Sequence, residues 1–370
     1  MRDFDNAFKS TFINAITPDN LKKEIISSAV IQIKQTLSEE LNKLHSRKPR
    51  FMTQGSAGYK TQNAPCHPEQ QIDYDIGCYF PFSEWEDEKP KRAAKEFFME
   101  VDTILEKLAQ ANDWELDKSK NTCCRVIIED DIHIDIPLYS IPDDEFKTIT
   151  ESTESRKSFS TMDSMESQEE SWDNFNFDKV LLAQREGDWI ESDPRKVNLY
   201  FKDAFEKKGE QFRRLCRYLK AWRDFKWKSG DPSSIFLMFL ADDLYEKNVD
   251  DGDDSALYLL LTKIPGRLNT PILNNAVYND EKKENLTERN IKYIENLKEF
   301  SSNFATDLGK AIYDETIDDI SACKLIQRHL GNRFPCCPIS ERKKKISDEI
   351  RKEPISTTSS NPLIRTRAGL

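Results

Sequence analysis

Apolar residues recur along the first part of the chain with two different spacings. Residues 19–44 predict a helix that Asp19 can cap, with an apolar stripe near the 3.6-residue period at Leu21, Ile25, Ile26, Val30, Ile33 and Leu37. Residues 72–80 alternate between apolar and polar positions, which predicts a strand. Residues 125–138 hold two strand-like runs around the acidic turn 129–131, which predicts a hairpin.

The second part of the chain has a different pattern. From about residue 198 onward it is mainly helical, and one basic segment carries an apolar face formed by Phe205, Phe212, Leu215, Leu219 and Trp222. Residues 51–71 predict a loop because they are punctuated by glycine and proline. Residues 150–172 are rich in serine and glutamate and predict a mobile insertion. We therefore expect a mixed core with an N-terminal helix at 1–177, a helical lobe at 178–338 and a flexible tail at 339–370.

Composition narrows the functional classes. The chain has 370 residues and a net charge of −11, which argues against a protein that coats nucleic acid, since such proteins need a basic surface. No segment has the length of apolar sequence that a membrane span needs, and the N-terminus lacks the apolar core of a signal peptide. Eight cysteines in so long a chain do not resemble a disulfide framework. We expect a cytoplasmic protein that needs neither a membrane nor an obligatory nucleic-acid partner.

Carboxylates on the predicted strands suggest a metal site. Asp73 and Asp75 lie on one face of the first strand because side chains alternate along a strand. Asp135 lies on the second run, two residues after His133. If the strands are neighbours, the three carboxylates converge and can hold two Mg²⁺ ions, with Mn²⁺ as an alternative, and Asp135 can accept the proton of an attacking hydroxyl. We expect His133 to be a hydrogen-bonded neighbour of this site rather than a ligand.

A glycine-serine pair precedes the carboxylates. Gly55 allows the backbone to approach a phosphate, and the Ser56 hydroxyl can bind a phosphate oxygen. An Asp-x-Asp pair alone often marks a solvated sheet edge. The combination of Gly-Ser, Asp-x-Asp and a later aspartate on an apolar strand favours a site for nucleoside triphosphates instead.

These residues resemble a known family. The similar stretches are 54–61, 65–77, 133–139, 192–195, 217–223 and 331–335. They resemble the CD-NTases, the nucleotidyltransferases similar to cGAS and DncV that occur in bacterial anti-phage CBASS operons, and most nearly the DncV-like branch. The resemblance covers about residues 20–338.

The resemblance implies an α+β fold with a DNA polymerase β-like core, a helical C-terminal lobe and an active site in the cleft between them. It implies that Asp73, Asp75 and Asp135 bind magnesium. The nucleotide contacts that it implies, together with those that the residue types suggest, are Gln54, Gly55, Ser56, Tyr59, Arg217, Lys220 and Ser234. For Tyr59, packing within the loop is the alternative to stacking on a base. For Arg217 and Lys220 the alternative is a solvated helix face, and for Ser234 it is a helix cap.

The expected function is a cyclic oligonucleotide synthase. Such an enzyme joins NTPs, ATP and GTP foremost, into a cyclic di- or trinucleotide with release of pyrophosphate. The family context implies a downstream CBASS effector that responds to the product, and an E1/E2-like partner that conjugates the C-terminus. Two alternatives remain at this point: a terminal nucleotidyltransferase that acts on RNA or protein, and a nucleotide sensor without turnover.

Overall fold

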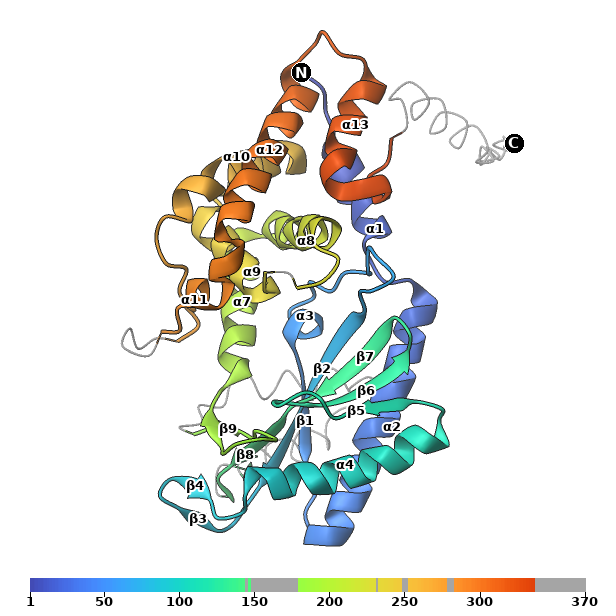
Figure 1. The fold of residues 1–370 in the computed structure, drawn as a ribbon, viewed down its shortest axis with the longest axis vertical. Helices are drawn as coiled ribbons and strands as arrows, with labels where there is room; N and C mark the ends of the chain where they lie inside the picture. The colour runs from blue at the N-terminus through green and yellow to red at the C-terminus, as the bar shows by residue number, and fades with distance from the viewer. Residues whose placement is uncertain (144–145, 148–178, 231, 248–251, 278–282, 337–370) are drawn as a thin grey trace, which may run out of the picture.

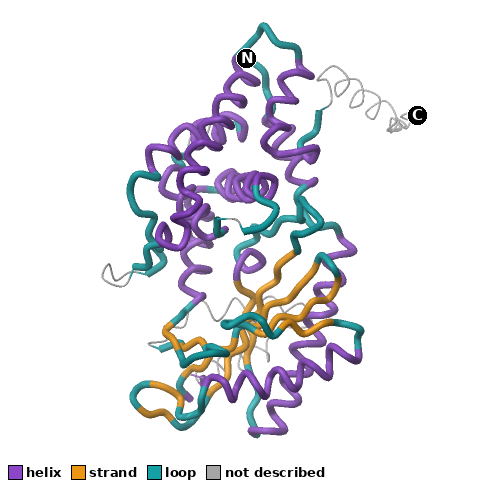
Figure 2. Tube along the Cα trace, viewed as in Figure 1, coloured by secondary structure: helices purple, strands orange, loops and turns teal. Residues whose placement is uncertain are grey.

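The computed structural model describes residues 1–143, 146–147, 179–230, 232–247, 252–277 and 283–336. The insertion expected at 150–172 and the tail expected at 339–370 lie outside these residues. The described chain forms two lobes, with the strands gathered in one and helices in the other (Figures 1 and 2). Among the described helices, none combines the length and the apolar character that a membrane crossing requires.

The sheet lobe is built on an eight-stranded sheet. Its strand order is β10-β9-β8-β2-β7-β6-β5, and β1 pairs with β2 outside this path. The strands are β1 (Arg50–Gln54), β2 (Ile72–Pro81), β5 (Glu115–Asp117), β6 (Cys124–Glu129), β7 (Ile132–Ile136), β8 (Leu138–Ile141), β9 (Leu181–Leu182) and β10 (Ile190–Glu191). A separate pair is formed by β3 (Trp85–Glu86) and β4 (Lys89–Pro90).

Strand β2 is central, since its first half pairs in parallel with β7 and its second half in parallel with β8. Strands β6 and β7 form the hairpin that the sequence predicts. The predicted loop at 51–71 is wrong in its first part, because residues 51–54 belong to β1 and residues 55–58 form the short helix α3 (Gly55–Gly58).

Two amphipathic helices cover one face of the sheet (Figure 1). They are α2 (Asn20–His45), capped by the Asp19 side chain as predicted, and α4 (Ala94–Ala111). Their apolar faces form one core with the inner residues of β2, β6 and β7. Leu21 is an exception to the predicted stripe, because it is 67% exposed. The opposite face of the sheet is left for the site and the helical lobe.

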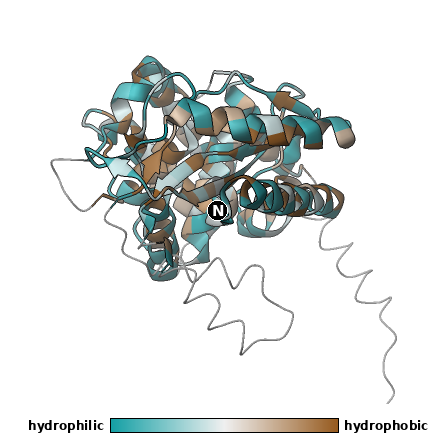
Figure 3. Ribbon diagram, turned by 90° about the horizontal axis from the view of Figure 1, so that it is seen from below, coloured by the Kyte–Doolittle hydropathy of each residue, from teal (hydrophilic) through white to brown (hydrophobic). Residues whose placement is uncertain are grey.

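The helical lobe follows β10. Its helices are α7 (Pro194–Lys208), α8 (Glu210–Lys226), α9 (Ser234–Leu244), α10 (Asp253–Arg267), α11 (Leu286–Asn290), α12 (Ile294–Tyr313) and α13 (Asp319–Leu330), with 3₁₀ turns at Ile291–Tyr293 and Gly331–Arg333. Gly209 divides the predicted basic segment, so Phe205 lies on α7 and the other four apolar residues on α8. Helices at the surface carry both hydrophilic and hydrophobic positions (Figure 3), as expected for amphipathic helices packed on a core.

The first residues of the chain also pack in the helical lobe. A π-helical segment (Ala7–Phe12) and α1 (Ile13–Ala15) precede α2. Phe4, Phe8, Phe12 and Ile16 are buried in the same core as α8 and α9. The expected division at residue 178 groups these residues with the sheet, whereas the structure packs them with the helices, because their apolar side chains need a core that the helical lobe supplies.

Candidate active site

Three aspartates meet where β2 and β7 run side by side. In the parallel register, Asp73 lies opposite His133 and Asp75 lies opposite Asp135. The intervening residues Ile72, Ile76, Ile132, Ile134 and Ile136 are fully buried on the face covered by α2 and α4. Apolar packing of one face therefore turns all the carboxylates to the other face.

Arg125 on β6 holds the third aspartate. Its Nε and Nη2 atoms donate to the two carboxylate oxygens of Asp135, each at 2.7 Å. Both side chains are largely buried, and Arg125 lies opposite Asp135 in the antiparallel register. The bidentate pair fixes the orientation of the Asp135 carboxylate. Each oxygen keeps a lone pair for a metal ion.

The sequence analysis did not identify Arg125, although a signal for it existed. Counting outward from the acidic turn at 129–131 of the predicted hairpin pairs residue 125 with residue 135. Arg125 and Asp135 lie opposite each other in the hairpin, so both side chains point to the same face of the sheet.

Gly55 brings the backbone against Asp75. Its φ is +58°, and a Cβ atom built there would lie 2.0 Å from Asp75 Oδ2. A side chain at this position would meet both left-handed backbone strain and a carboxylate. The start of α3 consequently lies directly above the acidic site, with Ser56 next in the chain.

The charges of the cluster are unbalanced. The pKa of Asp75 lies well above its usual value, because the carboxyl is shielded from solvent and because Asp73 and Asp135 repel its negative charge. Shielding also raises the pKa of Asp73, but the close approach of the His133 ring more than offsets it, so that this pKa lies below its usual value. Such repulsion is relieved when a cation binds between the carboxylates.

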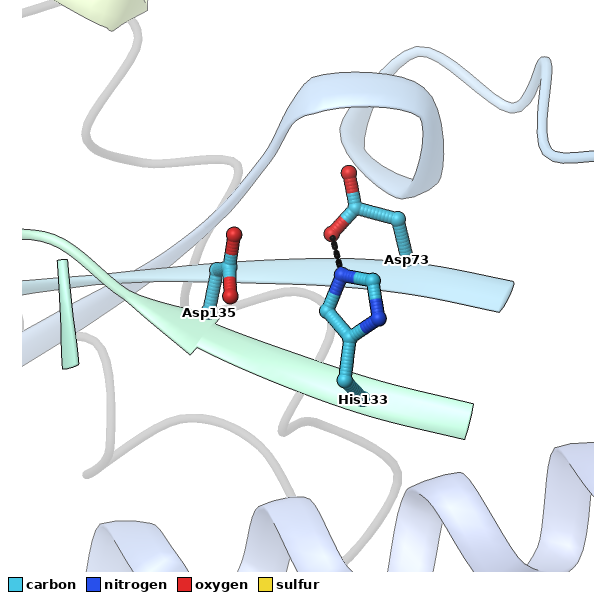
Figure 4. Close-up of side chains that lie close together, drawn as sticks. All are labelled: Asp73, His133 and Asp135. Carbon is cyan, nitrogen blue, oxygen red and sulfur yellow. Dashed lines mark ion pairs between the residues drawn. The ribbon is translucent and has the colours of Figure 1, made fainter. Parts of the chain in front are cut away.

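His133 also lies within this cluster (Figure 4). Its Nε2 atom is 2.9 Å from Asp73 Oδ1, and Asp73, His133 and Asp135 each offer a ligand atom within 4.8 Å of the others. This is a candidate metal site, and its oxygen donors fit a divalent cation.

A cleft of about 450 Å³ opens between the two lobes above these residues. Among the predicted site residues, those that line it are Gly55, Ser56, Tyr59, Asp73, Asp75, Lys220 and Ser234. The structure therefore brings seven of the predicted residues to one cavity and places Asp135 in the adjoining strand, 8% exposed.

Lys220 on α8 supplies a positive charge to the cleft. It is 4% exposed, and its Nζ atom donates to the carbonyl of Thr61 at 2.7 Å. Burial and the neighbouring Arg223 lower its pKa to about 8. An ammonium has three donors, so a phosphate can bind to those that Thr61 does not occupy.

Two further cations line the cleft that the sequence analysis did not single out, Arg223 and Lys228. Arg223 donates to Asp224 and, at 2.6 Å, to Ser234 Oγ. Ser233 rather than Ser234 caps α9, since its side chain accepts from the Phe236 amide. The expected alternative for Ser234, a helix cap, is therefore taken by its neighbour.

Two predicted nucleotide contacts lie in other surroundings. Gln54 is buried, and its side-chain amide is held between the hydroxyls of Tyr79 and Tyr139. Arg217 donates to Asn63 and to Thr17 and is not itself among the residues that line the cleft. Alternation along β1 and rotation along α8 account for these positions.

Tyr59 borders the cleft but is only 7% exposed. Its ring packs against Phe201 with the centroids 5.6 Å apart. Because so little of the side chain is exposed to a base in the cleft, the structure agrees better with the alternative of packing.

A loop links the aspartates to α8. Gln62 donates to the Asp73 carbonyl, and Gln70 donates to the carbonyls of Asp224 and Trp227. Arg333 of the distal turn donates to the Ala64 carbonyl of the same loop. These bonds fix the edge of the cleft to both lobes.

The fold and the cleft define the class of the protein. A sheet with an Asp-x-Asp strand, a third aspartate on the adjacent strand and a helical lobe across a cleft is a nucleotidyltransferase architecture. Comparison with known proteins then identifies the family. Residues 49–139 match the model of the "Cyclic GMP-AMP synthase DncV-like, nucleotidyltransferase domain", and residues 209–339 match the model of the "Cyclic GMP-AMP synthase, C-terminal domain". The chain belongs to the DncV-like nucleotidyltransferases.

Relatives and solved structures agree with this family. The chain is 37% identical over 233 residues to a cyclic GMP-AMP synthase of Escherichia coli, covering 60% of this chain and 54% of the relative. It is 38% identical over 217 residues to that of Vibrio cholerae, covering 56% and 49%. The chain thus spans about half the length of these relatives in the aligned regions.

The fold extends over almost the whole of a solved relative. Vibrio cholerae DncV in complex with the linear intermediate pppA(3′,5′)pG superposes with a TM-score of 0.74 and 22% identity, covering 90% of this chain and 96% of that one. The same protein in complex with GTP and 5MTHFGLU2 gives a TM-score of 0.73 and 25% identity, covering 90% and 97%. The expected fold class is confirmed.

Proposed function

We propose that this protein is a nucleotidyltransferase that joins ATP and GTP into a cyclic dinucleotide with release of pyrophosphate. The observation that carries the proposal is the placement of Asp73, Asp75 and Asp135 on neighbouring parallel strands beside the cleft. The names of the relatives, cyclic GMP-AMP synthases, support the choice of a dinucleotide made from these two NTPs.

Residues of both lobes can contact the triphosphate. The Lys220 ammonium and the Ser56 hydroxyl come from different lobes, line the same cleft and can both bind a triphosphate. Ser234 and Arg223 are hydrogen-bonded to each other at the same cavity and provide further phosphate contacts. Catalysis then depends mainly on positioning the two reacting groups and stabilising charge.

The donor set fits divalent metal ions. The carboxylates of Asp73 and Asp135 repel that of Asp75, and the three together would hold two Mg²⁺ ions. When bound, such ions activate the attacking hydroxyl and neutralise the triphosphate and the pyrophosphate that leaves. Arg125 donates to both oxygens of Asp135 and orients the carboxylate for a ligand role, and the expected role of Asp135 as proton acceptor stays a prediction.

The test is product formation from defined NTP mixtures. The purified full chain is incubated with Mg²⁺ and radiolabelled ATP and GTP, and the products are treated with phosphatase. We expect a phosphatase-resistant product whose mass is that of a cyclic dinucleotide, and its loss with Asp73→Asn. Linear products that require an RNA primer, or nucleotide binding without pyrophosphate release, would contradict the proposal. The downstream effector, the conjugating partner and the cytoplasmic location stay predictions.

A further inference from the structure

His133 is buried beside the aspartates with one ring nitrogen unsatisfied. The residue is 6% exposed, and its Nε2 atom makes no hydrogen bond of acceptable geometry, although Asp73 Oδ1 lies only 2.9 Å away. A buried polar atom without a hydrogen bond is costly unless another ligand binds it.

The contacts of the second ring nitrogen show that Nδ1 is a donor. His133 Nδ1 lies 2.9 Å from Gln71 Oε1, and Gln71 Nε2 donates to the Asp130 carbonyl at 2.9 Å. The latter bond fixes the orientation of the amide, so Oε1 is the atom that faces the ring and Nδ1 must donate. When the ring is neutral, the form that binds a metal, the lone pair of Nε2 faces Asp73.

A lone pair facing a carboxylate is repulsive unless a cation, either a proton or a metal ion, lies between them. Two ligands in cis positions of an octahedral ion at about 2.1 Å are about 3 Å apart. The 2.9 Å separation of Nε2 and Oδ1 is of that size. Asp135 offers its oxygen within 4.8 Å of both (Figure 4), so three donors from two strands surround one position.

We infer that His133 is a nitrogen ligand of the metal site, oriented by Gln71, and that it gives this site a preference for Mn²⁺ over Mg²⁺. The inference rests on the proposed function only in assuming that a divalent metal ion binds at this site. It replaces the expectation that His133 is a neighbour of the site. A hydrogen bond from the second ring nitrogen is the usual support of a histidine that binds a metal.

The chemistry of the donor set determines the preference. Mg²⁺ favours oxygen ligands and gains little from an imidazole, whereas first-row transition ions accept nitrogen readily. Removal of the imidazole should therefore weaken Mn²⁺ binding and leave Mg²⁺ binding little changed.

The chain offers a matched control in His45. Its Nε2 atom is also 2.9 Å from a carboxylate, Oε2 of Glu100. Among the described residues, however, the group of Asp73, His133 and Asp135 is the one set of three or more donors close enough to hold a metal. His45→Gln thus removes a histidine–carboxylate pair without touching the inferred site.

The experiment measures metal binding to the nucleotide-free full chain. Mn²⁺ alone is titrated and the free ion is followed by electron paramagnetic resonance, while Mg²⁺ binding is measured by its competition with Mn²⁺. We expect Mn²⁺ affinity to fall at least about 10-fold in His133→Gln and in Gln71→Met, and Mg²⁺ affinity to change less than about threefold in His133→Gln. His45→Gln should match the unmodified protein in both.

A spectroscopic measurement separates coordination from a structural effect. Electron spin echo modulation of bound Mn²⁺ should show a histidine nitrogen in the unmodified protein and in His45→Gln, and none in His133→Gln. Absence of the nitrogen signal in the unmodified protein, or its persistence in His133→Gln, would overturn the inference. Product formation without nitrogen coordination would leave the proposed function standing, and nitrogen coordination without product would leave the inference standing.

Discussion

Arg125 binds both carboxylate oxygens of Asp135 across two adjacent strands, at 2.7 Å each. Without Arg125, the negative charge of Asp135 would lose its ion-pair partner on this side of the sheet. We expect Arg125→Met to lower the free energy of unfolding by roughly 3 kcal/mol, because one partner of a largely buried ion pair is removed. Urea unfolding in the presence of EDTA measures the loss.

The same variant provides a test of metal linkage. A divalent ion that binds only the folded protein adds stability by mass action. Addition of Mg²⁺ or Mn²⁺ should therefore recover a larger part of the stability in Arg125→Met than it adds to the unmodified protein. Equal stability with and without Arg125 in EDTA would contradict the assigned ion pair.

We expect Asp75 to lower the stability of the metal-free protein and to be required for activity. Its pKa lies well above the usual value, so at neutral pH its ionised form weakens the folded state. Asp75→Asn removes that charge, and we expect the metal-free protein to become more stable by about 1 kcal/mol. Pyrophosphate release from NTPs should fall at least about 100-fold, since a metal ligand is lost.

The matched control for this change is Asp73→Asn. Its pKa lies below the usual value because of His133, so the ionised form contributes to stability that would be lost as pH falls through that pKa. Asp73→Asn should thus be inactive and also less stable. The same sign of stability change in both variants would show that the electrostatic argument is wrong.

Lys220 predicts a pH dependence of nucleotide binding. Its pKa of about 8 means that the ammonium is present below pH 8 and is lost as the pH rises through that value. The KM for NTPs should therefore rise between pH 7.5 and 9, with kcat affected less because a bound triphosphate stabilises the charged form. Steady-state kinetics of the unmodified protein and of Lys220→Arg provide the comparison, since an arginine keeps its charge over this range. A KM that rises equally in both would assign the effect to another group.

Gln54 should act on stability rather than on nucleotide binding. Its amide lies between the Tyr79 and Tyr139 hydroxyls, and a Cβ atom at Gly77 would lie 1.9 Å from its Nε2 atom. Gln54→Met leaves the two hydroxyls without this partner, and we expect a loss of about 2 kcal/mol in unfolding free energy. The KM for NTPs should stay within about twofold of the original. A large rise in KM with unchanged stability would restore the expected nucleotide contact.

The positions of the three aspartates were predictable from the sequence because strand alternation leaves little choice. Once Ile72, Ile76 and the isoleucines of 132–136 are assigned to packing, the carboxylates must face the other way. That β2 and β7 are neighbours was an assumption, because about 60 residues separate them in the sequence. The order of strands in a sheet cannot be derived from the local pattern of apolar residues.

The contacts from the helical lobe were harder to predict. Arg217, Lys220 and Arg223 lie on one helix and have the same charge, yet only the last two line the cleft. The direction of each depends on how α8 is rotated against the loop at 62–70, which is a tertiary property. Likewise, the burial of Tyr59 follows from Phe201 on a distant helix, and no local pattern indicates that contact.

The burial of Phe4, Phe8 and Phe12 against residues 212–334 has a consequence for biosynthesis. These phenylalanines leave the ribosome early, but the helices that cover them are translated some 200 to 300 residues later. The sheet can therefore fold before the helices that bury this apolar segment have been synthesised. Chaperone dependence during translation should therefore be concentrated in the first sixteen residues, although they touch neither substrate nor metal.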